Sequence, residues 1–249
     1  MGDIAVNLIE SRQQGGDSSF FDSNIYTPPA NRMVYAINYS VQIAVSPVLI
    51  PGVTGNGLTW DLVLHQTFDH AGTDRGSLTI HRTVGASPTS ARTRITYQAS
   101  QLRNAMTILE GVNVATQFSG VESVVQTKSL KIADGTTLLP SVTLDDPASQ
   151  SNNSVLGVLA WGSLVGGANP SLANGVGFTI VAQTNTAEGG GNAAEFRGPF
   201  QQLTDWIAND VDFAWGVAAL ELKNAETPPD PDAPQVIGRP SFISGNLIT

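Results

Sequence analysis

The chain has 249 residues and a formal net charge of −9 at neutral pH. Only 13% of its residues are charged, against about 25% in an average globular protein, so Ser, Thr, Asn, Gln and Gly must cover much of the surface. This composition excludes the basic surface that nucleic-acid binding needs, and the absence of cysteine excludes disulfides and thiolate metal sites.

The first half of the chain alternates apolar and polar residues, the pattern of β-strands with one buried face. Short strands are predicted at residues 4–10 and 20–26, and a long central strand at 33–45. Residues 58–65 and 77–81 alternate on either side of a Gly/Asp turn. They predict an antiparallel hairpin with one buried face and one face in solvent.

The second half continues with short apolar segments separated by polar loops. In the last apolar segment, residues 211–223, the positions of the apolar side chains change from one face to the other at Ala218 and Ala219, which predicts a β-bulge. The only helical candidate is a single turn within residues 201–209. Further strands are predicted at 91–97, 106–114, 142–144, 155–161, 178–181, 194–200 and 211–223.

These spacings predict an all-β protein, a two-sheet antiparallel β-sandwich of jelly-roll type with an extended C-terminal arm. Residues 1–223 are expected to form a single sandwich, with the first strand, 4–10, as a candidate assembly arm. Residues 224–234 are a Pro-rich acidic linker. Residues 235–249 form an apolar tail that we expect to dock on another subunit through Phe242, Ile243, Leu247 and Ile248.

Two groups of residues are candidates for metal binding, each with a simpler alternative. His65 and His81 fall on polar-facing positions of the hairpin, with Asp69 and Asp74 nearby, but the pattern favours ordinary surface histidines. Residues 145–146 (Asp-Asp) and 152–153 (Asn-Asn) offer oxygen ligands for calcium, but they lack the order of a calcium loop and favour a solvated turn. We therefore expect no metal.

The sequence contains no recognisable catalytic constellation. Glycoside hydrolysis would need two facing carboxylates, and no spacing brings two glutamates together. Nucleophilic-serine and phosphate-binding motifs are absent, so we expect neither an enzyme nor a cofactor. Trp60, Trp161 and Trp215 fall in core phase, whereas Trp206 is the one candidate for exposure and for stacking on a sugar; burial is the favoured alternative. The glutamates considered are Glu110, Glu122, Glu188, Glu195 and Glu221.

Residues 20–223 carry five short motifs in a fixed order. Together they resemble a β-sandwich module of tailed-phage and prophage virion proteins and of some bacterial surface proteins. The resemblance implies a structural or adhesive module with a lectin-like jelly roll. The motifs are TPPANRMV at 27–34, GNGLTW at 55–60, LTIHR at 78–82, QFSGVE at 117–122 and AWGVAALEL at 214–222.

The leading functional prediction is a phage virion structural protein, either a head decoration or fibre-base protein or a tail component. It would act by assembly with other virion proteins or copies of itself. The N-terminal residues lack the pattern of a secretory signal, so we expect synthesis in the host cytoplasm and a final location in the virion. The alternative is a carbohydrate-binding module that recognises a host-surface glycan. Neither nucleic acid nor a membrane is an expected partner.

Overall fold

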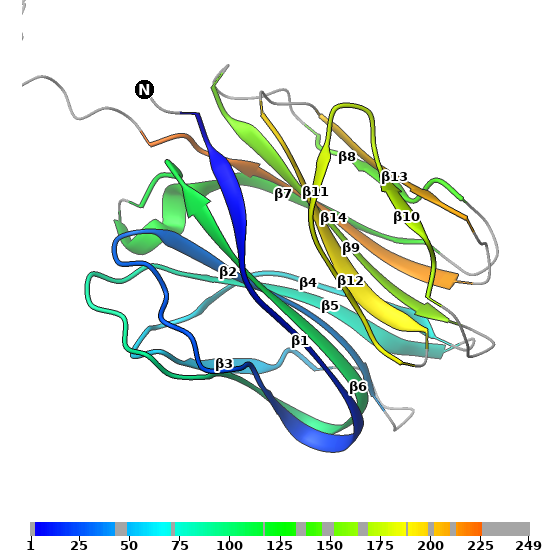
Figure 1. Cartoon of the computed structure of the whole chain (residues 1–249). Helices are drawn as coiled ribbons and strands as arrows, with labels where there is room; N and C mark the ends of the chain where they lie inside the picture. Colours follow the sequence, from blue (N-terminus) through cyan, green and yellow to red (C-terminus); the bar gives the residue numbers. More distant parts are fainter. Residues whose placement is uncertain are drawn as a thin grey trace, which may run out of the picture.

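A computed structural model (Figure 1) shows an all-β protein of three antiparallel sheets, as the sequence predicts. The first two sheets pack face to face, and the third covers the outer face of the second. The structure describes residues 3–42, 49–70, 73–116, 118–132, 138–145, 152–163, 169–187, 189–198, 202–209 and 213–225.

The first sheet contains the strands of the N-terminal half in the order β1-β6-β2-β5-β4, and β3 pairs with β6 beside this path. A short 3-10 helix, η1 (Phe118–Ser123), leads out of this half. The strands are β1 (Ala5–Asp22), β2 (Met33–Gln42), β3 (Gly52–Gly55), β4 (Asp61–His70), β5 (Thr73–Thr83) and β6 (Thr93–Val112).

The second sheet has the order β11-β12-β9-β14-β7, and the third has the order β10-β13-β8. Each half of the chain therefore fills its own sheets, and the predicted jelly-roll arrangement is not confirmed. The strands are β7 (Val124–Ile132), β8 (Ser141–Thr143), β9 (Ser154–Ser163), β10 (Leu172–Asn174), β11 (Thr179–Asn185), β12 (Gly190–Arg197), β13 (Leu203–Ala208) and β14 (Phe213–Leu222).

The main core lies between the facing sides of the first two sheets. From β2 it receives Tyr35 and Ile37, and from β5 it receives Ile80. Leu156 of β9 and Leu220 of β14 close it from the second sheet, and all five side chains are fully buried. The alternation of β2 and β5 therefore identifies the inward-facing residues correctly.

A second core lies between the second and third sheets and contains three tryptophans, Trp161, Trp206 and Trp215. Because β14 is covered on both faces, its residues are buried along its whole length. Trp215 faces the second core and Leu220 the main core, and the pairing of β14 with β9 is continuous. The predicted bulge is wrong, since two buried faces account for the change of phase without one.

The expectation that the polar face of the hairpin lies in solvent is also wrong. β1 and β6 are long strands of 18 and 20 residues that pair with each other. The C-terminal end of β1 and the N-terminal end of β6, together with β3, form a layer over the outer face of β2 and β5. Asn38 and Thr79 are consequently fully buried, and the Tyr97 hydroxyl donates to Asn38 Oδ1 at 3.2 Å. The residues of this sealed layer include apolar Phe21 and Ile95.

Several predicted elements join or change type in the structure. β1 contains residues 5–10 of the strand predicted at 4–10 but only residues 20–22 of that predicted at 20–26. β6 contains residues 93–97 and 106–112 of the strands predicted at 91–97 and 106–114. The candidate helical turn at 201–209 contains β13 instead. Because β1 is hydrogen-bonded to β6 over most of its length, its first residues are part of the sheet.

Candidate functional site

The two histidines considered as metal ligands lie on the covered face of the first sheet. His81 is only 4% exposed and donates a hydrogen bond to the Pro51 carbonyl. Burial lowers the pKa of His81 to about 4, so the imidazole is neutral at physiological pH. The surface position favoured for His81 is therefore wrong. The side chains of Asp69 and Asp74 lie outside the described residues.

The residues considered as calcium ligands contact other side chains. Asp145 forms an ion pair with Lys128, and Asn153 Nδ2 donates to Glu221 Oε1 at 2.6 Å. Asp146 lies outside the described residues. Within the described ranges, no group of three or more His, Cys, Asp and Glu side chains is arranged to hold a metal ion.

Removal of divalent cations with EDTA is expected to leave the melting temperature unchanged. A bound metal would stabilise the folded state by mass action, and its removal would lower the melting temperature. Differential scanning calorimetry with and without the chelator measures this directly. A fall of several degrees that added calcium or zinc reverses would contradict the expectation.

Trp206 is buried, as the favoured alternative predicts, and is not exposed. It is fully buried in the second core, because the side of β13 that carries Thr204, Trp206 and Ala208 faces the second sheet. Leu203 and Ile207 point to solvent instead. A buried indole offers no face to a sugar ring, so the structure gives no support for sugar stacking at this residue.

Most of the glutamates considered for catalysis are held by neighbouring polar groups. Glu110 accepts a hydrogen bond from Asn7 at 2.8 Å, and Glu122 pairs with Lys223 at 3.2 Å. Glu221 is buried and accepts from Gln126 at 2.7 Å as well as from Asn153. Glu188 lies outside the described residues.

Glu195 differs, because it is fully buried between the second and third sheets. Its Oε2 accepts the Gly175 backbone N–H at 3.2 Å, whereas its Oε1 has no partner. Burial raises the pKa of Glu195 to about 8; the Gly175 hydrogen bond acts against this shift and nearby Asp205 adds to it. A Cβ on Gly157 would lie 2.4 Å from the Thr204 methyl group, so glycine is required beside this acid. Glu195 is therefore largely protonated at neutral pH.

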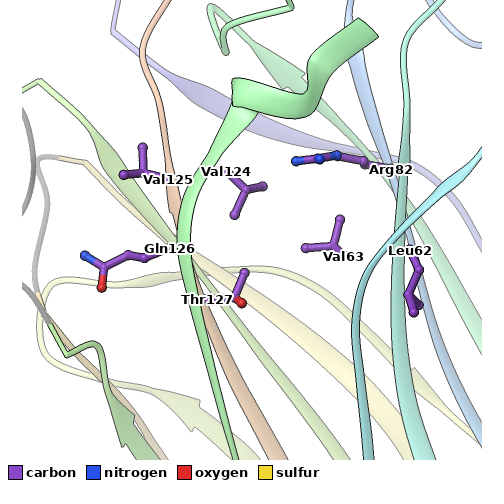
Figure 2. Close-up of a pocket in the computed structure, with 7 residues that line it drawn as sticks. All are labelled: Leu62, Val63, Arg82, Val124, Val125, Gln126 and Thr127. Atoms are coloured by element: carbon purple, nitrogen blue, oxygen red, sulfur yellow. The ribbon is translucent and has the colours of Figure 1, made fainter. Parts of the chain in front are cut away.

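An open groove of about 210 Å³ lies between β4 and β7, and we call it the edge groove (Figure 2). Leu62 and Val125 on its rim are each 41% exposed. Among the described residues β4 pairs with β5 alone and β7 with β14 alone, so within these residues both strands are the edges of their sheets. The lining residues are Leu62, Val63, Arg82, Val124, Val125, Gln126 and Thr127.

Arg82 is the charged residue of the edge groove. Figure 2 shows its side chain extending from β5 toward Val124. Its Nη1 donates to Ser123 Oγ at 3.4 Å, whereas its buried Nε has no partner. Further along the two strands, Ser129 Oγ donates to Gln66 Oε1 at 2.9 Å and links β7 to β4. The groove therefore combines an apolar rim, two sheet-edge strands and one cationic side chain.

The sequence does not predict the edge groove, because no strand is predicted at residues 124–132, which form β7. The available signal was the alternation of Leu130 and Ile132 around Lys131. Even if the sequence predicted β7, its pattern of apolar and polar residues would not show that β7 lies beside β4, which belongs to a different sheet.

No helix in the described part of the chain is long and apolar enough to span a membrane. Comparisons with protein-family models, with curated proteins and with solved structures found no match to this chain.

Proposed function

We propose that this protein is a structural subunit of a phage virion and that it acts by binding copies of itself or neighbouring subunits. The observation that carries the proposal is the edge groove, where the edge strands of two sheets of the described structure lie beside exposed apolar side chains. Such edges readily accept a strand from another chain, and monomeric proteins commonly protect them.

Exposed apolar side chains on other described surfaces support an assembly role. Leu130 lies further along β7 and is 48% exposed, and Leu8 and Phe20 are exposed on the edge strand β1. A subunit that is covered by neighbours on several sides has such surfaces. The other large apolar residues that are exposed are Ile25, Leu49, Ile50, Leu62, Val125, Leu138, Leu139, Val176, Leu203 and Ile207.

The assignment to a virion depends on the resemblance of five ordered motifs and on the low charge content. A head decoration protein, a fibre-base protein and a tail component all fit these features. The carbohydrate-binding alternative receives less support, because Trp161, Trp206 and Trp215 are fully buried and Trp60 is partly buried.

A chain that ends at residue 225 is expected to fold like the complete chain but to lose self-association. The shortened chain keeps the contacts that anchor its end, since Ala225 N–H donates to the Asn113 carbonyl at 2.8 Å and Asn224 N–H donates to Asn153 Oδ1 at 3.2 Å. Sedimentation velocity over a range of concentrations gives the mass of both chains, and their melting temperatures report folding.

The matched control is the complete chain with Phe242→Ser and Ile243→Ser, which keeps the length and the acidic linker. It is expected to sediment as the shortened chain does. A complete chain that stays monomeric at all concentrations, and that binds no other component of its particle, would overturn the proposed function.

A further inference from the structure

We propose that the edge groove binds the C-terminal segment of a second copy of this chain, residues 235–249, which adds a strand to the free edge of β7. This inference rests on the proposed function and names the contact through which association occurs. Three features support it: the shape of the groove, the charges around the groove and the point at which the described chain ends.

The edge groove has the form of a strand acceptor. β7 runs for nine residues, Val124–Ile132, and uses one side of its backbone to pair with β14. Its first four residues, 124–127, line a space of about 210 Å³ beside β4, far more than a single water occupies, and beyond this space Ser129 Oγ donates to Gln66 Oε1 at 2.9 Å. A strand added here would gain backbone hydrogen bonds from β7 and apolar contacts from Leu62 and Val125, the two sources of affinity in strand addition.

The C-terminal segment has the apolar residues that such an acceptor requires. Phe242 and Ile243 form one apolar pair and Leu247 and Ile248 a second, within a segment that contains a single charged residue, Arg239. Alternate residues of a strand face the same side, so one member of each pair can enter the groove while the other covers its rim.

The charges around the groove are complementary to the linker that carries the segment. Two of the three lysines of this acidic chain are on β7, Lys128 and Lys131, and the third, Lys223, directly follows β14. Lys128 forms an ion pair with Asp145, and Lys223 pairs with Glu122 at 3.2 Å. Arg82, whose Nη1 donates to Ser123 Oγ at 3.4 Å, is the positively charged residue that lines the groove. The linker carries three acids and no basic residue, namely Glu226, Asp230 and Asp232. Opposite charge of this kind steers association and favours one orientation of the bound segment.

The geometry favours a second copy over the same chain. The described chain ends at Ala225, just after Leu222, and Leu222 pairs directly with Val124 at the groove. The nine residues 226–234 contain four prolines. In extended polyproline form they span about 28 Å at roughly 3.1 Å per residue. A stiff spacer of this length carries the apolar segment past the adjacent groove and toward that of a neighbour.

Disulfide trapping between two complete chains tests this inference, since the natural chain contains no cysteine that would interfere. A chain with Val125→Cys is mixed under mild oxidation with a chain of different mass that carries Phe242→Cys. The expected product is a cross-linked heterodimer. The matched control is Ile207→Cys, because Ile207 is 47% exposed on β13, outside the groove lining. It is expected to give no heterodimer above the background of random collision.

Leu62→Cys on the opposite rim gives a second trap if Val125→Cys disturbs folding, and it is expected to cross-link as well. Equal trapping by Ile207→Cys would overturn the assignment to the groove. A further chain carries both Val125→Cys and Phe242→Cys. If this chain forms the disulfide only within itself and the mixture of single-cysteine chains gives no heterodimer, a second copy is not the source of the segment. If the complete chain associates in sedimentation but neither rim cysteine is trapped, the groove assignment fails while the structural function stands. If the complete chain neither associates nor binds another component, the proposed function itself fails.

Discussion

Replacing Trp215 by alanine is expected to lower the free energy of unfolding by about 3–5 kcal/mol. The indole is fully buried on β14, directly opposite Trp161 of β9, and its ring centroid lies 5.5 Å from that of Phe213. Its removal would leave a cavity where the third sheet packs on the second. Urea denaturation followed by circular dichroism measures the change.

Trp60→Ala provides the control for this prediction. Trp60 was expected to be a core residue, but it is partly buried at the edge of the layer over the first sheet, with its indole nitrogen 3.5 Å from the Gly55 carbonyl. Its truncation should therefore cost less than that of Trp215. Equal costs for the two variants would contradict the assignment of Trp215 to a principal core.

Raising the pH from 5 to 8 is expected to destabilise the protein through Glu195 by an amount on the order of 3 kcal/mol. The pKa of this carboxyl rises from an ordinary value of 4.5 to about 8 in the folded state, because burial disfavours its charged form. The folded state therefore binds more protons than the unfolded state between these two values. The stabilisation is fully present below pH 4.5 and is lost as the pH rises through 8.

Glu195→Gln tests this prediction, because the amide keeps the shape of the protonated acid but does not titrate. The variant should lose much less stability than the natural chain between pH 5 and 8. Urea midpoints at several pH values give the comparison. Asp205→Asn is the matched variant of the neighbouring acid, and it should reduce the pH dependence only in part, since burial is the main cause of the shift. Identical pH profiles for the natural chain and Glu195→Gln would contradict the account.

Local patterns in the sequence predict strands well where one face is apolar. Tyr35 and Ile37 of β2 lie in the main core as their alternation requires. Alternation cannot show what covers the opposite face, which is why Asn38 and Thr79 were expected in solvent. The layer over them forms because the long β1–β6 ribbon bends back across the sheet, a consequence of tertiary packing.

The edge groove could not be predicted for a related reason. Its residues come from β4, β5 and β7, and neighbouring strands of one sheet account only for the first two. The approach of β7 to β4 depends on how the first two sheets align when their main core forms. Likewise, the phase change in β14 reflects two separate cores, because Leu220 and Trp215 face different sheets.

An electron cryomicroscopy map of the associated form tests the central claim most directly. If the protein is a structural subunit, the map should show regular contacts between copies or with other components of a particle. The account predicts additional density along the free edge of β7, continuous with the C-terminal residues of a neighbouring subunit. A map in which subunits meet through other surfaces, with solvent between β4 and β7, would contradict it.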